Sequence, residues 1–427
     1  MKRIFAFACV CLSVDAILLA QAPIVLKAGT LIDIESGRAI SNQVILVEGQ
    51  KIRRVSSNVP IPAGARIIDL SNATVLPGLI DAHTHLLTNN KVELGGDENN
   101  LNLVVTQMSL ANRALLGAAM AREVLEAGIT TVRDLGNSGW NGDVALRNAI
   151  NDRWVIGPRM VVSTRALAPI GGQFVSVTPE ARSIIEQEFA QITGVNEARR
   201  AVRQAIFDGA DCIKIIADGS GVSLALDELK AIVEEAHAAG RKVAVHADNR
   251  SARLALDAGA DSIEHGWFLS DDLLRAMAEK KVFLVPTDAS WEMWAEEFGA
   301  DSPYFASNKA LFERTHKRLR RAIDLGVPVA TGSDVYYESK WTRGLASVMR
   351  MVRPMREAGI SPIEIIRAAT IRAAELLGWQ DRIGSIREGK FADLIAVRGD
   401  PLQDITVLEH VAFVFKGGVI IKNDFSQ

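Results

Sequence analysis

The chain has 427 residues, 48% of them hydrophobic, so it can bury a large core and lacks the composition of a disordered protein. Its 48 basic and 51 acidic residues give a formal net charge of −3 with no basic block, which argues against a nucleic-acid-binding protein. After the first twenty residues, no apolar run is long enough to span a membrane.

The N-terminal stretch "MKRIFAFACVCLSVDAILLAQAP" has the layout of a secretory signal peptide. Two basic residues precede an apolar segment that ends in small residues. We therefore predict that residues 1–20 are a signal peptide and that the protein is exported to the periplasm or the medium. An ordinary N-terminal helix or a retained anchor is the alternative. Cys9 and Cys11 fall inside this segment, so only Cys212 would remain and no disulfide framework is expected.

Both ends of the chain are rich in short strand patterns. Runs such as "IVLKAGTLID" and "QVILVEGQKI", separated by Gly or Asn turns, occupy residues 24–76, and the same texture returns in residues 386–424. Two β-rich ends that flank a different middle predict one small β-sandwich domain assembled from both termini.

The middle of the chain, residues 77–385, alternates strand-like runs with amphipathic helical stretches. Several runs are preceded by a Gly that suits a helix end, as in "DAGADSI". Eight strands that alternate with helices predict an α/β fold, a (β/α)8 TIM barrel. The predicted strands span residues 78–85, 129–136, 158–167, 211–217, 242–247, 261–266, 283–287 and 327–334.

Ionisable residues stand at the ends of five of these strands, where burial is costly unless the group is paired or bound to a metal. His83 and His85 point to the same face of a strand, with α-carbons roughly 6.8 Å apart, so both imidazoles can reach one ion. The other three histidines fall in predicted helices or the terminal β domain. The candidate metal ligands are His83, His85, Lys214, His246, His265 and Asp334.

Imidazole and carboxylate ligands without thiolates suit zinc or a similar divalent ion. Four histidines and one aspartate exceed what a single tetrahedral zinc needs. Lys214 accounts for the surplus if its neutral amine adds carbon dioxide, because the resulting carbamate (N6-carboxylysine) can bridge two metals. The alternative is a lysine that extends to solvent or pairs with Asp211 or Asp218.

The motifs "LPGLIDAHTH", "CIKI", "VHAD", "SIEHG" and "TGSD", in this order, resemble the amidohydrolase superfamily, and "GSIREGKFADLIAV" strengthens the match. The "ALAPIGG" loop and "AATIRAAELLG" are similar to the binuclear-zinc branch of prolidase-like and Xaa-Arg carboxypeptidase-like members, with ochratoxin-type N-acyl amino acid hydrolases nearby.

The resemblance implies two zinc ions. His83, His85 and Asp334 would hold the more buried ion, and His246 and His265 the more exposed one. Carboxylated Lys214 and a hydroxide would bridge the two ions. Asp334 would accept the proton of the attacking hydroxide and pass it to the departing amine.

The loops that follow the strands supply candidate substrate contacts. Gln173 and Asp248 stand where relatives often carry other residues, and an acidic Asp248 predicts a preference for basic or neutral groups beside the scissile bond. The arginines could pair with a substrate carboxylate and the tyrosines could offer a hydroxyl or a ring face. These candidates are Arg165, Gln173, Asp248, Arg250, Tyr336 and Tyr337.

The sequence thus predicts a metal-dependent hydrolase that cleaves an amide in a dipeptide, releasing its C-terminal residue, or in an N-acyl amino acid. Its expected partners are small-molecule substrates; neither nucleic acid nor, after signal removal, a membrane is expected, and a homo-oligomer is compatible with the sequence. The alternatives are a single-metal deaminase or imidazolonepropionase-like ring hydrolase, a lactonase or phosphotriesterase, and a non-catalytic metal-binding barrel protein.

Overall fold

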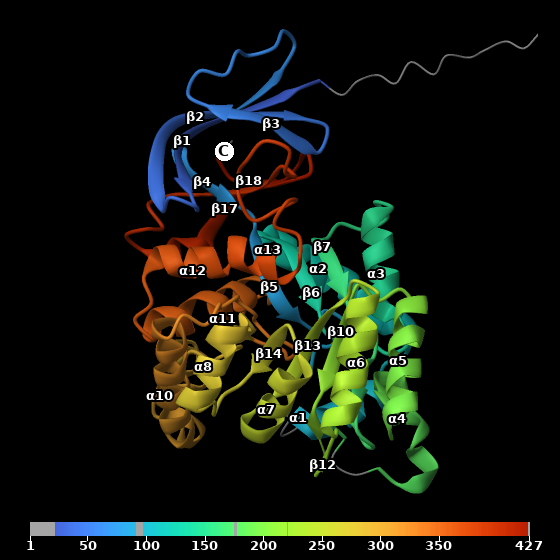
Figure 1. The fold of residues 1–427 in the computed structure, drawn as a ribbon. Helices are drawn as coiled ribbons and strands as arrows, with labels where there is room; N and C mark the ends of the chain where they lie inside the picture. The colour runs from blue at the N-terminus through green and yellow to red at the C-terminus, as the bar shows by residue number, and fades with distance from the viewer. Residues whose placement is uncertain (1–21, 91–96, 175–176, 220, 426–427) are drawn as a thin grey trace, which may run out of the picture.

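The computed structural model describes residues 22–90, 97–174, 177–219 and 221–425, and the statements below concern those residues. They form a mixed α/β structure with a large sheet at one end of the molecule (Figure 1). Parallel strands and surrounding helices make up the remainder. The predicted signal peptide, residues 1–20, lies outside the described residues.

The large sheet has seven strands and joins the two ends of the chain. β16, from the C-terminal part, pairs antiparallel with β4, from the N-terminal part, with Leu394 opposite Pro77. The sequence predicts a sandwich here; hydrogen bonds connect all seven strands into a single sheet with an apolar core of its own. In spatial order the strands are β18 (Val419–Asn423), β17 (Val411–Lys416), β16 (Asp393–Val397), β4 (Arg66–Pro77), β1 (Ile24–Asp33), β2 (Arg38–Glu48) and β3 (Lys51–Ser56).

The central strands run parallel in two groups, and most are buried along their whole length, as expected when both faces are covered. A small antiparallel hairpin of β11 (Asp218–Gly219) and β12 (Val222–Ser223) follows β10. The first group is β5 (Leu79–Thr84), β6 (Ile129–Asp134) and β7 (Arg159–Val162). The second is β15 (Phe283–Val285), β14 (Ser262–His265), β13 (Lys242–Ala247), β10 (Cys212–Ile216), β8 (Ala166–Ala168) and β9 (Phe189–Gln191).

Backbone hydrogen bonds connect the two parallel groups at both margins. At one margin the N–H of Asp211, next to β10, donates to the carbonyl of Val162 in β7 over 2.7 Å. At the other margin lie residues 327–334, where the sequence predicts a strand and the structure has a single β-bridge to β15. The N–H of Ala82 in β5 donates to the carbonyl of Thr331 in this segment over 2.9 Å.

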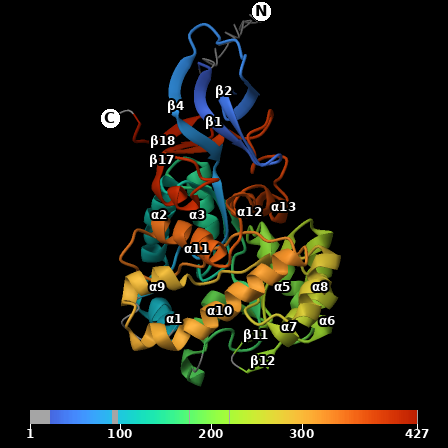
Figure 2. The same ribbon diagram turned by 90° about the vertical axis from the view of Figure 1, so that its left-hand side faces the viewer.

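The helices surround the parallel strands (Figures 1 and 2), and their buried apolar residues belong to the core that they share with those strands. α5, for example, buries Ala198, Ala201, Val202 and Ala205, which are spaced three or four residues apart. None of the helices described has the length and apolarity needed to cross a membrane. The helices are α1 (Asp97–Gln107), α2 (Leu110–Glu126), α3 (Gly142–Asn151), α4 (Ser183–Glu188), α5 (Val195–Phe207), α6 (Leu226–Ala238), α7 (Asn249–Ala258), α8 (Asp271–Lys280), α9 (Trp291–Phe298), α10 (Pro303–Asp324), α11 (Arg343–Glu357), α12 (Pro362–Ala368) and α13 (Ile371–Leu376), with 3-10 turns at Pro179–Ala181 and Ile405–His410.

The Gly that precedes a predicted strand ends a helix as expected. Gly259 follows α7 with a φ of 90°, in the left-handed region where a residue with a Cβ is disfavoured, and β14 begins at Ser262. Short helix-to-strand connections of this kind keep the strands parallel and in register, so their carboxyl ends meet at one side of the molecule.

Candidate metal centre

All six ligands predicted from the sequence line one cavity of about 400 Å³. Five of them stand at or near the carboxyl ends of parallel strands or of the segment 327–334, and Lys214 lies in the middle of β10. The tertiary structure therefore brings together residues that are up to 251 positions apart, as the barrel pattern predicts. These residues are His83, His85, Lys214, His246, His265 and Asp334.

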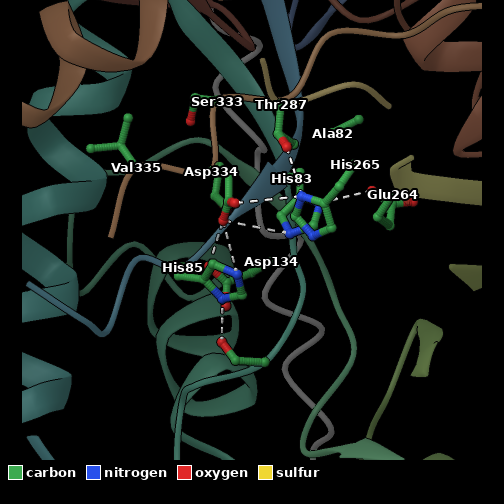
Figure 3. Close-up of polar contacts among 12 residues, drawn as sticks. Ala82, His83, His85, Asp134, Glu264, His265, Thr287, Ser333, Asp334 and Val335 are labelled. Carbon is green, nitrogen blue, oxygen red and sulfur yellow. Dashed lines mark hydrogen bonds and ion pairs between the residues drawn. The ribbon is translucent and has the colours of Figure 1, made fainter. Parts of the chain in front are cut away.

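The tightest group is formed by His83, His85 and Asp334, whose potential ligand atoms all lie within 4.8 Å of one another. Asp334 Oδ1 lies 3.3 Å from His85 Nε2 and 3.7 Å from His83 Nε2. His265 approaches the same carboxylate, with Nδ1 3.7 Å from Asp334 Oδ2. Each distance exceeds that of a typical hydrogen bond, so the groups converge on a common point without pairing tightly (Figure 3).

The two β5 histidines are oriented by hydrogen bonds on the far side of each ring. His83 Nδ1 lies 2.8 Å from Glu264 Oε2, and His85 Nδ1 lies 2.9 Å from the carbonyl oxygen of Gly136. A carbonyl oxygen can only accept, so the proton of neutral His85 sits on Nδ1 and its Nε2 lone pair faces Asp334. The same assignment holds for His83 beside a carboxylate. Metal-binding histidines have this arrangement.

Glu264 is buried and links His83 to Arg133. Arg133 Nη2 donates to Glu264 Oε1 over 2.8 Å, and Ser262 Oγ donates to the same oxygen over 2.5 Å. Burial acts to raise the pKa of Glu264, but Arg133 and His83 outweigh it and lower the pKa to about 2. The carboxylate is therefore ionised and fixes the orientation of His83. Sequence reasoning missed this pair, although both residues are ionisable groups inside apolar strands.

His246, His265 and Lys214 form the opposite side of the cavity. The rings of His246 and His265 have centroids 4.4 Å apart, and burial together with nearby Lys214 lowers the pKa of His246 to about 3. Lys214 is 2% exposed and has no hydrogen-bond or ion-pair partner among the described residues. Burial lowers the pKa of Lys214 to about 8, although the nearby carboxylates of Glu264 and Asp334 act to raise it. Its amine is thus more readily neutral than that of a solvated lysine.

The backbone is strained at this centre. His265, Thr287 and Asp334 have φ values of 66°, 49° and 51°, in the left-handed region that residues with a Cβ rarely adopt. Thr287 is β-branched, and its Oγ1 lies 2.7 Å from His265 Nδ1. Such conformations cost about 1–3 kcal/mol each and persist where the surroundings enforce them, most often at functional sites.

Two of the six predicted substrate contacts line the cavity. Gln173, in the loop after β8, and Tyr336, two residues after Asp334, are both half-buried there. Tyr337 is not among the lining residues; it forms a β-bridge with Asn90, and its hydroxyl is buried.

Arg165 does not reach the cavity because the predicted strand over residues 158–167 is interrupted. Thr164 has a φ of 61°, which breaks the chain into β7 and β8 and turns Arg165 outward. Its Nη1 donates to the carbonyl of Glu186 over 2.7 Å, and its guanidinium lies 3.9 Å from the ring centroid of Trp140.

Asp248 and Arg250 also lie outside the cavity lining. Asp248 is the N-cap of α7, and its Oδ1 accepts hydrogen bonds of 2.9 Å from the N–H groups of Asn249 and Phe268. The carboxylate that the sequence suggested as a charge selector is therefore engaged by backbone donors. Arg250 lies exposed in the first turn of α7.

Other lining residues were not identified from the sequence. Asp218 begins the hairpin after β10, Trp267 follows His265 by two positions, and Phe189 starts β9. Asp218 and Trp267 could have been found from the sequence, because each follows the end of a predicted strand. Phe189 lies in a short strand that the sequence pattern did not indicate.

The side chains present fit a divalent metal. In their neutral forms His83 and His85 offer Nε2 lone pairs beside the carboxylate of Asp334, which is the donor set that zinc and similar ions prefer. Glu264 and the carbonyl of Gly136 lie behind the two rings and orient them, as the outer partners of metal-binding histidines do.

Comparisons with known proteins agree with this geometry. Residues 74–421 match the Amidohydrolase family. Ochratoxinase of Aspergillus niger is 30% identical over 436 residues, covering 93% of this chain and 86% of the relative. Imidazolonepropionase of Geobacillus kaustophilus is 28% identical over 455 residues, covering 95% of each chain. The crystal structure of a Xaa-Pro dipeptidase with methionine in its active site has a TM-score of 0.81 at 32% identity, covering 93% of this chain and 99% of the other.

Proposed function

The chain belongs to the amidohydrolase family and is a hydrolase of carbon–nitrogen bonds, and we propose that it cleaves the amide of a dipeptide, releasing the C-terminal residue, or of an N-acyl amino acid. The observation that carries the proposal is the pair of oriented imidazoles, His83 and His85, whose Nε2 atoms face Asp334. The similarity to ochratoxinase and to a Xaa-Pro dipeptidase supports amide substrates of this class.

Asp334 moves the proton in this scheme. Water attacks the amide carbonyl carbon, its proton goes to a carboxylate oxygen of Asp334, and the same proton is delivered to the departing nitrogen as the C–N bond breaks. Burial acts to raise the pKa of Asp334, but the positive charge that His83, His85 and His265 carry when protonated outweighs it and holds the pKa well below its usual range, so the carboxylate is ionised. A bound divalent metal would polarise the carbonyl and make the attacking water more acidic.

The protein would hold two divalent ions, zinc being the expected metal. His83, His85 and Asp334 would bind one, His246 and His265 the other, and Lys214 would join both as N6-carboxylysine. Burial of Lys214 beside the cavity and its lowered pKa support this role, because only a neutral amine can add carbon dioxide.

A single-metal ring hydrolase is the second candidate, since imidazolonepropionase is among the similar proteins. The buried Lys214 in β10 favours the two-metal enzyme over it, because a single-metal site has no use for an additional bridging anion.

Three further expectations remain part of the proposal. Residues 77–385 would form one closed (β/α)8 barrel, supported by the hydrogen bonds at both margins of the parallel sheets. Residues 24–76 and 386–424 would form a separate β-sandwich domain, supported by their shared sheet and core. Residues 1–20 would direct export to the periplasm or medium; mass spectrometry of the protein from its host should then find a chain that starts near Gln21.

The test combines metal analysis with a substrate screen. Elemental analysis of purified protein should find two divalent ions per chain, and a panel of dipeptides and N-acyl amino acids should release free amino acid. His83→Asn should lose metal and activity, whereas the matched control His410→Asn, at an exposed residue outside the cavity, should keep both. One ion per chain at full activity would favour the ring hydrolase, and metal binding without hydrolysis of any member would contradict the proposal.

A further inference from the structure

Trp267 forms an aromatic part of the cavity wall beside the candidate metal ligands. Its ring centroid lies 4.9 Å from that of His265 and 6.5 Å from that of His246. The residue is nevertheless 37% exposed, so part of the indole remains available to a ligand. A group bound in this cavity can therefore contact Trp267 and lie beside His246 and His265.

The backbone around Trp267 is fixed by a tight turn. His265 and Gly266 have φ values of 66° and 52°, and the N–H of Gly266 donates to the carbonyl of Glu264 over 3.0 Å. A side chain at Gly266 would also collide with Leu269, because an added Cβ would lie 2.6 Å from Leu269 Cδ1. The turn therefore constrains the backbone immediately before Trp267.

Asp248 anchors the residue that follows. Its two carboxylate oxygens accept from the N–H of Phe268 at 2.9 and 3.1 Å, and Arg314 stacks on the Phe268 ring at 4.3 Å from its centroid. Asp248 is half-buried at the end of β13, the strand next to β14. It thus holds the backbone next to Trp267 without lining the cavity itself.

Part of the remaining wall is apolar. Phe189, Leu101 and Ile216 line the cavity from other elements and are almost fully buried around it. Aromatic groups prefer such surroundings, where ring contacts add to the gain from excluding water.

From these contacts we propose that Trp267 is a specificity-determining residue that selects amides carrying an aromatic group beside the scissile bond, and that Asp248 is a positioning residue acting through the N–H of Phe268. The inference rests on the proposed amide hydrolysis. It assigns to Asp248 a hydrogen-bonding role in place of the charge selection suggested by the sequence.

The test compares Ala-Phe and Phe-Ala with Ala-Ala in the metal-loaded enzyme, so that the aromatic group is placed on either side of the amide. Wild type should prefer at least one aromatic dipeptide by about tenfold or more in kcat/KM, which corresponds to about 1.4 kcal/mol. Trp267→Ala should lose that preference, because its kcat/KM should fall further for the preferred aromatic dipeptide than for Ala-Ala; Trp267→Phe should keep most of it. The control Trp291→Ala, at an exposed tryptophan outside the cavity lining, should behave as wild type.

The Asp248 variants separate hydrogen bonding from charge. Asp248→Asn retains an oxygen that can accept from Phe268 and should keep the aromatic preference, whereas Asp248→Ala should reduce it. The inference fails if Trp267→Ala leaves the ranking unchanged, if it lowers all three rates equally, or if Asn and Ala at position 248 behave alike.

If wild type hydrolyses none of the three dipeptides, the proposed function loses its support, and calorimetry still tests Trp267. Phenylalanine should then bind more tightly than alanine to metal-loaded wild type and not to Trp267→Ala. Equal binding of both amino acids to wild type would overturn the inference independently of catalysis.

Discussion

Replacing Glu264 with Gln tests how the layer behind the metal ligands supports both the fold and the site. Glu264 is fully buried and binds His83 Nδ1 at 2.8 Å and Arg133 Nη2 at 2.8 Å. Glu264→Gln keeps the shape of the side chain but leaves the buried guanidinium of Arg133 without its countercharge. Breaking a buried ion pair from one side costs about 3–5 kcal/mol of the free energy of unfolding. Loss of the carboxylate behind His83 should also weaken metal affinity by about 10–100-fold.

Urea denaturation in the presence of a chelator measures the free energy of unfolding. Competition with a chromophoric chelator measures the metal affinity. Glu126→Gln is the matched control, because its pair with Arg122 is solvent-exposed and should contribute little to the free energy of unfolding. The double variant Arg133→Met/Glu264→Gln removes both charges and should recover much of the stability while metal affinity stays low. The reasoning is refuted if Glu264→Gln is no less stable than the control, or if the double variant is as unstable as the single one.

Further outcomes follow from individual residues. Lys214→Ala should abolish activity and reduce bound metal, and acetate or formate supplied with metal should restore part of the activity; wild-type rates would make Lys214 an ordinary buried lysine. Asp218→Asn should improve kcat/KM several-fold for acidic relative to basic substrates, because a carboxylate leaves the cavity wall, and the exposed control Asp301→Asn should not change the ratio. Burial lowers the pKa of Lys416 to about 8, so the unfolded chain binds more protons between about pH 8 and 10.5. Wild type should therefore gain stability relative to Lys416→Met as pH rises through this window in thermal denaturation, and a constant difference would contradict the assignment.

The sequence was most informative where the pattern is local and repeated. Alternating helices and strands predicted the parallel strands, and a Gly such as Gly259 correctly marked the helix-to-strand connections. The convergence of His83, His85 and Asp334 in one cavity was predictable because polar residues that follow parallel strands meet at the carboxyl side of the sheet. The pairing of both chain ends in one sheet also followed from their β-rich composition.

Loop residues were less predictable. A local left-handed residue, Thr164, reverses the expected direction of Arg165, and a sequence pattern carries almost no signal for such a conformation at Thr. From the sequence, Asp248 is expected to be a free acidic group beside a strand end. In the folded chain, the carboxylate of Asp248 accepts a hydrogen bond from the N–H of Phe268, twenty positions away, and does not line the cavity.

The layer behind the metal ligands depends on the longest-range contacts. His83 and Glu264 are 181 positions apart, and Arg133 joins them from a third strand. The sequence determined by itself which residue types stand at the strand ends, because alternation and helix periodicity are properties of neighbouring residues. The tertiary structure alone decided which of those side chains face the cavity and which are held by remote hydrogen-bond partners, because those choices depend on groups that become neighbours only when the parallel strands pack side by side.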